Sequence, residues 1–515
     1  MPIAGAIVGI YSGLAAGALA NGVGFLTGLA LGEGRLWAAA TQGPGVLAAP
    51  VMQAFRAASW HPEYAVGGIP LALIALWFSR GPGETSTERE EQQLGRRRLR
   101  TLGLLLLGAI ALYYQLVVLA ALNAAFGYHE DLLTAIQEMP FWARILTPAA
   151  GGLVVGYILK GHPEVWGHGI PEVVGAVDNG GKGIDARAGI IKLIASSVTI
   201  GSGGSTGREG PITFGAGAIA ASVGRTLGFS EKELCALIAG GAGAGIAASF
   251  NAPLAGAIFG LEIILRKIEL RVLSPILLAS ATATMVGQSV LGKAPVLDHL
   301  DYYLRSGWEL LTYALLGILI GVFSFGFTRI LHHVESFFTG KWKWLFLSRW
   351  LGLLPLPLRA CVGGALVGLM CVFFWEGTII WGSGHEYVNL ALDGKLTAWQ
   401  MATSAMAKVI GTVTTLGSGG AGGLFFPSAV LGSMTGGTLG GLLHSWAPTM
   451  FGRAGAYATV GMGGAVAAIL RGPMMALVMV YELSGDYEVM LPLMITCTIS
   501  SELCHALRQR SGAAH

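Results

Sequence analysis

Apolar runs long enough to span a bilayer recur from the first residues of this 515-residue chain to nearly the last. A membrane-spanning helix needs about 20 apolar residues. The runs in the first third of the chain cover residues 3–32, 64–79, 101–126 and 140–160. Only 12% of the residues are charged, which is about half the share in a soluble domain. We therefore expect an all-α integral membrane protein with many passes, whose 79 glycines allow close helix packing.

Basic residues between the apolar runs indicate which loops face the cytoplasm, because short cytoplasmic loops are enriched in Lys and Arg. The hydrophilic segment 80–100 ends in such a cluster and is predicted to be cytoplasmic, as is a short tail over 506–515. The acidic segments 127–139 and 294–306 are predicted to lie outside. The other basic positions assigned to the cytoplasm are Lys182, Arg187, Lys192, Arg266, Lys267, Arg271, Lys341, Lys343, Arg349, Arg508 and Arg510.

The chain contains an internal repeat. The segment KLIASSVTIGSGGSTGREGP (192–211) is echoed by KVIGTVTTLGSGGAGGLFFP (408–427). The segment 241–263, which contains Glu262, is echoed by 461–483, which contains Glu482. Repeats in a multi-pass membrane protein usually form two similar bundles that face each other, with the substrate site between them near the midplane. We predict a first repeat core over residues 140–290 and a second over 307–505. The pattern leaves open whether the repeats are inverted.

Three glycine-rich breaks interrupt the apolar helices, at 167–171 (GHGIP), 201–211 (GSGGSTGREGP) and 417–427 (GSGGAGGLFFP). In hydrocarbon, unsatisfied backbone groups cost several kcal/mol each, so such breaks survive only where they are buried or line a polar cavity. Glycine permits the turn, and a following proline can begin a new helix. The free N–H groups and the dipole at a helix N-terminus attract an anion. The three breaks therefore predict an anion site within the membrane that binds weakly enough to release the ion.

Two other interpretations of the breaks are less favoured. In the first interpretation, the glycines serve only close helix packing. Against it, two of the three breaks occupy repeat-related positions. A phosphate-binding loop would carry Lys and then Ser or Thr where this chain has Arg208 and then Glu209. A glutamate at that point would repel phosphate.

The motifs GHGIP (167–171), GREGP (207–211), GGLFFP (422–427) and FNAPLAGAIFGLE (250–262) resemble those of the CLC family of chloride channels and proton/chloride antiporters. The similarity runs from about residue 140 to 505. The resemblance implies an inverted-repeat helical bundle with broken re-entrant helices, of the bacterial type without C-terminal CBS domains. It also implies a homodimer in the bacterial plasma membrane, with a pore in each subunit.

Individual site residues are implied by the same resemblance. Glu209 matches the gating glutamate, the N–H groups of Leu424 and Phe425 match those that hold the central anion, and Tyr487 matches a tyrosine whose hydroxyl donates to it. A lone tyrosine near a helix end is otherwise an interfacial anchor. The implied anion-binding set is His168, Gly169, Ile170, Arg208, Glu209, Gly210, Gly423, Leu424, Phe425 and Tyr487. Since burial disfavours a carboxylate, we expect acid to neutralise Glu209 and open the path.

The chain departs from the family in three places. His168 stands where the family usually has a serine, and its imidazole could gain charge near neutral pH. Ile263 stands where proton-coupled members usually carry an internal glutamate, while its neighbour Glu262 matches a different family residue. Residues 33–139 exceed what the family needs. Either 64–79 and 101–126 form an inserted helix pair, or 101–126 is the first family helix and everything before it is an extension.

These features favour an anion channel without tight proton coupling, because Ile263 cannot titrate. A proton-coupled anion antiporter shares the same anion motifs and is the main alternative. A membrane-embedded enzyme would need clustered ionisable groups or metal ligands, but the eleven histidines are dispersed and the five cysteines are isolated. We expect no metal, no cofactor and no nucleic-acid partner. The expected substrate is chloride or another small anion.

Overall fold

Helices make up nearly all the regular structure in the described part of the chain. The computed structural model describes residues 2–31, 139–267, 270–291, 306–343, 345–374 and 377–512, together with a few single positions before 139. The predicted helix pair, the loop 80–100 and almost all of the two acidic segments lie outside these residues. Six of the described helices are long and apolar enough to cross a membrane. The prediction of an all-α membrane protein is confirmed.

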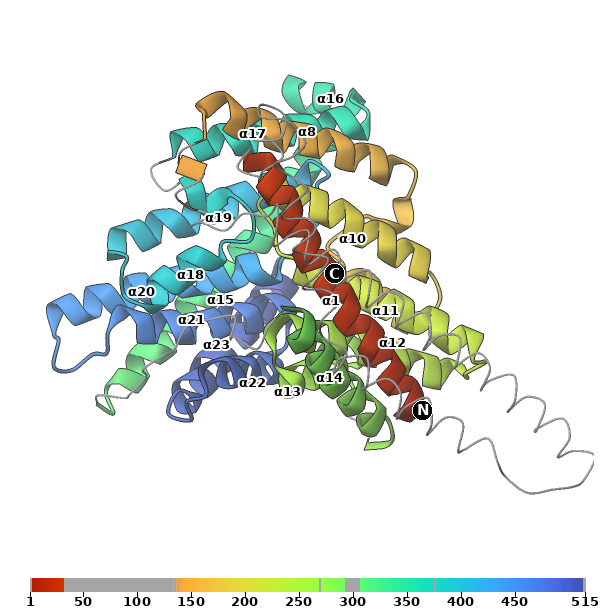
Figure 1. The fold of residues 1–515 in the computed structure, drawn as a ribbon. Helices are drawn as coiled ribbons and strands as arrows, with labels where there is room; N and C mark the ends of the chain where they lie inside the picture. Colours follow the sequence, from red (N-terminus) through yellow and green to blue (C-terminus); the bar gives the residue numbers. More distant parts are fainter. Residues whose placement is uncertain are drawn as a thin grey trace, which may run out of the picture.

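The helices fall into two consecutive sets (Figure 1). The first set comprises α1 (Pro2–Leu31), α8 (Phe141–Lys160), α9 (Ile170–Asp178), α10 (Ala186–Gly201), α11 (Glu209–Thr226), α12 (Glu231–Phe250), α13 (Pro253–Phe259), which continues as a π-helix over Gly260–Leu265, and α14 (Leu270–Leu291). The second comprises α15 (Glu309–Phe338), α16 (Phe346–Leu353), α17 (Leu356–Phe373), α18 (His385–Leu392), α19 (Ala398–Gly417), α20 (Phe425–Trp446), α21 (Ala454–Leu470), α22 (Pro473–Ser484) and α23 (Met490–Arg510). Short 3-10 turns cover Pro163–Val165 and Gly377–Ile380. The last helix, α23, extends through Arg510 and so includes part of the predicted tail 506–515.

The two sets repeat one packing scheme. In the first set α1 packs against α14, α12 and α10, and in the second α15 packs against α23, α21 and α19. Figure 1 shows α1 running obliquely across this first set, while α8 and α17 lie together where the sets meet. In this scheme α1 takes the place in the first set that α15 has in the second. This packing favours the interpretation in which 33–139 contains an insertion after the first family helix.

Two glutamates tie the sets together reciprocally. The carboxylate of Glu262 accepts hydrogen bonds of 3.0 and 2.7 Å from two N–H groups in the first turn of α22. The carboxylate of Glu482, at the end of α22, accepts bonds of 3.0 and 2.7 Å from the first turn of α13. Each carboxylate therefore caps N–H groups that a helix leaves without partners. Each glutamate lies near the C-terminal end of its own helical segment and caps the N-terminus of the other helix. The helices α13 and α22 therefore run antiparallel, as an inverted repeat requires.

Candidate functional site

Two of the glycine breaks pair directly with each other. The N–H of Gly207 donates to the carbonyl of Gly423 at 2.9 Å, and the N–H of Gly423 donates back to Gly207 at 2.7 Å. The hydroxyl of Thr206 also donates to the Gly423 carbonyl, at 2.9 Å. These bonds satisfy backbone groups that the breaks expose inside the protein. They also bring the N-termini of α11 and α20 together.

The third break meets the other two at Gly210. A Cβ atom added to Gly210 would lie 2.1 Å from the His168 carbonyl oxygen and 2.9 Å from the Cα atom of Gly423. Gly169 sits in the left-handed region at a φ of 99°, and its N–H donates to the Glu172 carboxylate at 2.6 Å. The N-termini of α9, α11 and α20 therefore converge around one backbone position, as the sequence predicted.

Two buried lysines hold the loops that precede α9 and α18. The ammonium of Lys192 donates to the carbonyls of Val165 (2.8 Å) and Gly167 (2.5 Å). Lys408, its repeat partner, donates to two carbonyls before α18 at 3.1 and 2.7 Å. Both side chains are buried. The prediction that Lys192 lies in a cytoplasmic loop is wrong, because carbonyls released by the helix break solvate its charge inside the protein.

Glu209 is the first residue of α11 and is fully buried. Its Oε1 atom lies 3.7 Å from Nε of Arg208, and neither carboxylate oxygen has a hydrogen-bond partner among the described residues. The backbone N–H groups of Arg208 and Glu209, and that of Phe426 in the first turn of α20, lie close enough to stabilise this carboxylate. The carboxylate thus lies between two helix N-termini, where an anion is favoured.

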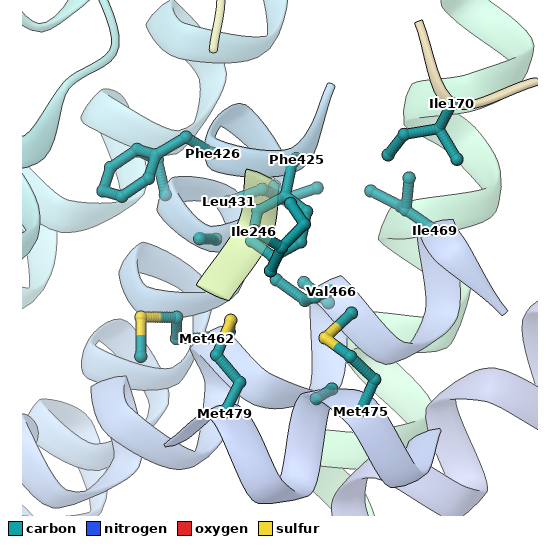
Figure 2. Packing of buried hydrophobic residues seen from close by; sticks show 14 of the residues in the cluster. Ile170, Ile246, Phe425, Phe426, Leu431, Met462, Val466, Ile469, Met475 and Met479 are labelled. Carbon is teal, nitrogen blue, oxygen red and sulfur yellow. The ribbon is translucent and has the colours of Figure 1, made fainter. Parts of the chain in front are cut away.

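The walls around this point are apolar, and the donors come from the backbone. Phe425 begins α20, is fully buried, and its ring centroid lies 5.1 Å from that of Phe250. Figure 2 shows Phe425 beside Ile246 and Ile170 facing Ile469. Leu424 is the N-cap residue of α20. The first N–H groups of a helix have no partner within it. An anion at this point would therefore meet N–H donors and apolar side chains.

His168 lies in the loop just before α9 and pairs with a residue from the other half. Its Nε2 atom is 3.2 Å from Oε1 of Glu335, in the last turn of α15. Its Nδ1 atom is buried and has no hydrogen-bond partner in the described part of the chain. His332 also faces Glu335, at 3.9 Å. Sequence reasoning missed Glu335 because nothing in the sequence connects it with His168.

A second histidine was also missed. The segment 382–385 precedes α18 as GHGI precedes α9, which makes His385 the repeat counterpart of Ile170. The Nδ1 atom of His385 lies 2.5 Å from the Ser383 hydroxyl, and its ring stacks on Phe426 with centroids 3.5 Å apart. The segment 363–388 is a weak echo of 151–174 in the sequence, and this echo could have indicated the position of His385.

The structure contradicts the placement of Tyr487 that the resemblance implied. Tyr487 lies in the turn between α22 and α23 rather than in a long helix, and 76% of its surface is exposed. Its ring packs edge-on against Tyr481, with centroids 6.4 Å apart. The chain leaves α22 through Gly485 at a φ of 67°, so the residue falls in the connection between the helices. Tyr487 does not join the other site residues.

The position of the missing internal acid is apolar and packed. Ile263 is buried in the π-helix that continues α13. A Cβ atom added to Gly472 would lie 2.6 Å from its Cδ1 atom, so the side chain reaches the start of α22. Its neighbour Glu262 is engaged by the α22 backbone. Ile263 has no carboxylate, and the carboxylate of Glu262 is bound by the α22 backbone, so neither residue supplies a free acid at this point.

Comparison with known proteins agrees with this geometry. Residues 151–505 match the family model described as voltage gated chloride channel. A putative chloride channel protein ClcB-like of Ralstonia nicotianae is 32% identical over 74% of this chain and 86% of its own length. The H(+)/Cl(−) exchange transporter ClcA of Cronobacter sakazakii is 30% identical over 71% of this chain and 78% of its own length.

Solved structures share the fold. A slow cyanobacterial Cl−/H+ antiporter has a TM-score of 0.64 and 24% identity, over 73% of this chain and 87% of that one. A CLC-type fluoride/proton antiporter has a TM-score of 0.60 and 22% identity, over 72% of this chain and 88% of that one. With its matched repeats, its converging helix breaks and these relatives, the chain belongs to the CLC family of voltage-gated chloride channels.

Proposed function

We propose that this chain passes chloride and similar small anions through the convergence of α9, α11 and α20, with Glu209 as the gate and without tight coupling to protons. The observation that carries the proposal is the buried Glu209 carboxylate, which lies between two helix N-termini without a hydrogen-bond partner among the described residues. Members of the family transport ions rather than catalyse reactions. Family membership therefore favours transport over the alternative of a membrane-embedded enzyme.

The geometry supports a simple gating cycle. An ionised Glu209 competes with an anion for the positive ends of α11 and α20. Protonation removes that charge, so the side chain leaves and an anion can take its place. The N–H groups of Leu424 and Phe425 would hold the anion by partial charges, which favour entry without preventing exit. The Arg208 guanidinium, which is partly exposed, would attract anions toward the entrance.

The absence of tight proton coupling is supported by the packing around Ile263. Proton-coupled members usually carry a second titrating group on the cytoplasmic side, although some couple without it, and the family position for it holds a buried isoleucine here. Proton-coupled exchange is the second candidate function, because His168 and Glu335 place titratable groups near the cytoplasmic end of the site. One relative is named as a channel and another as an exchange transporter, so their names support both candidates.

We further propose that the protein works as a homodimer in a bacterial plasma membrane, with one anion path in each subunit. The family resemblance supports the dimer, and the bacterial sources of ClcB-like and ClcA relatives support the location.

Transport itself is tested with purified protein in liposomes that contain potassium chloride and no other solute. After dilution into low chloride with a potassium ionophore, we expect chloride to leave far faster than from protein-free liposomes. The driving force is the gradient alone, so no added substrate is required. Efflux equal to that of protein-free liposomes, from protein that is monodisperse in detergent, would contradict the proposal.

A further inference from the structure

The contact between His168 and Glu335 restricts how the imidazole can act. An ionised carboxylate can only accept hydrogen bonds, so the Nε2 atom that faces Glu335 at 3.2 Å must carry the proton. In the neutral ring the other nitrogen, Nδ1, then presents a lone pair. That Nδ1 atom is buried, without a hydrogen-bond partner in the part of the chain that the structure describes. A neutral His168 therefore offers an anion no donor on that side.

Protonation of the His168 ring gives Nδ1 a hydrogen to donate. A proton from the cytoplasmic solution adds to the Nδ1 lone pair, the contact between Nε2–H and Glu335 is kept, and the ring gains one positive charge. Nδ1 becomes an N–H donor, and the carboxylate stabilises the resulting imidazolium by Coulomb attraction. The His168 carbonyl lies against Gly210. The backbone of His168 therefore lies against the residue that follows Glu209.

We propose that Glu335 and His168 form an acid-strengthened anion site at the cytoplasmic mouth, in which Glu335 fixes the tautomer and stabilises the charge of His168. This inference rests on the proposed anion path and adds a regulation to it. The cytoplasmic assignment follows from Lys341 and Lys343, which come directly after α15. Glu335 is a positioning residue here, because it acts on the anion through His168.

On α11, which packs against this loop at Gly210, Arg208 and Glu209 face each other at 3.7 Å. The other charged groups near the loop have contacts of their own. On α9, the Glu172 carboxylate accepts from the N–H of Gly169. On α10, the Lys192 ammonium donates to the carbonyls of Val165 and Gly167. On α15, His332 lies 3.9 Å from the second oxygen of Glu335 and is mostly exposed. Of these groups, His332 is the one that faces Glu335, so it requires its own control.

Chloride binding measured by calorimetry tests the proposal. Potassium chloride is titrated into detergent-solubilised protein at pH 6, 7 and 8, in the Glu209→Gln background so that the gate does not titrate. We expect affinity to rise as pH falls, by at most about tenfold per pH unit for a single proton. Adding Glu335→Gln, which keeps an acceptor but removes the charge, should move the rise to lower pH.

Two further variants separate the positioning effect of Glu335 from the charge of His168. Glu335→Leu frees the Nδ1–H tautomer, so the neutral ring can donate; affinity at pH 8 should increase and the pH dependence should flatten. His168→Ser supplies a hydroxyl at every pH and should bind chloride with a flat profile. His332→Gln is the matched control and should keep the rise.

The outcomes distinguish this inference from the proposed function. Binding that is present but independent of pH in the Glu209→Gln background would overturn the inference and leave the anion path intact. A rise that persists unchanged in Glu335→Leu, or one that disappears in His332→Gln, would also overturn it. Absence of chloride binding in every variant, together with absence of efflux, would instead contradict the anion path itself.

Discussion

Replacing Glu209 by glutamine is expected to hold the anion path open at every pH. Glutamine is close in size but carries no charge, so it cannot compete with an anion for the N-termini of α11 and α20. In the wild type, flux should rise as pH falls, since acid neutralises the carboxyl, with a limit of about tenfold per pH unit for one proton. In the variant, flux at pH 7.5 should match the acid plateau of the wild type.

The measurement is chloride efflux from liposomes between pH 4.5 and 8. Glu231→Gln is the matched control, because Glu231 also begins a helix but is exposed at the surface. That control should keep the wild-type profile. A Glu209→Gln variant that retains the wild-type dependence on pH would show that another group is the gate.

Substituting Gly210 by alanine is expected to abolish transport. The added methyl group would lie 2.1 Å from one backbone oxygen and 2.9 Å from a second backbone atom, and neither neighbour is a flexible side chain. Overpacking a close-packed interior costs about 1–3 kcal/mol or more. The three helix N-termini would have to separate, which removes the donors from the anion position. We expect lower thermal stability in detergent and efflux close to that of protein-free liposomes.

Gly175→Ala provides the matched control for this substitution. Gly175 lies within α9, and an added Cβ atom would meet nothing within 4 Å. Alanine is favoured over glycine in a helix by about 1 kcal/mol. This variant should be at least as stable as the wild type and should transport normally. Normal efflux from Gly210→Ala would mean that the convergence of the three breaks is not the anion path.

The sequence was sufficient to predict the breaks and the repeats, because their causes are local. A glycine-proline break is visible in the chain itself, and what it implies in hydrocarbon follows from unsatisfied backbone groups. The contact between Gly207 and Gly423 can be expected once the two repeats are assumed to face each other. The reciprocal caps of Glu262 and Glu482 were not predicted, although the repeat had already paired the two residues.

Contacts between segments that are far apart in the chain and unrelated by the repeat could not be predicted from the sequence. Glu335 reaches His168 from the far end of α15, and no spacing rule joins the two positions. Lys192 looked like part of a basic loop, because the enrichment of lysine in cytoplasmic loops is a statistical rule that ignores burial. Tyr487 was placed by resemblance alone, whereas the turn at Gly485 leaves it exposed between two helices.

The central claim, that anions pass without tight proton coupling, is tested most directly by recording chloride and protons together. Sealed proteoliposomes are given an outward chloride gradient, the membrane potential is clamped with a potassium ionophore, and external pH is followed during efflux. The packing of Ile263 predicts that chloride leaves while external pH changes no more than in protein-free liposomes. Sustained uphill proton movement in fixed proportion to chloride would contradict the account and identify the protein as an exchanger.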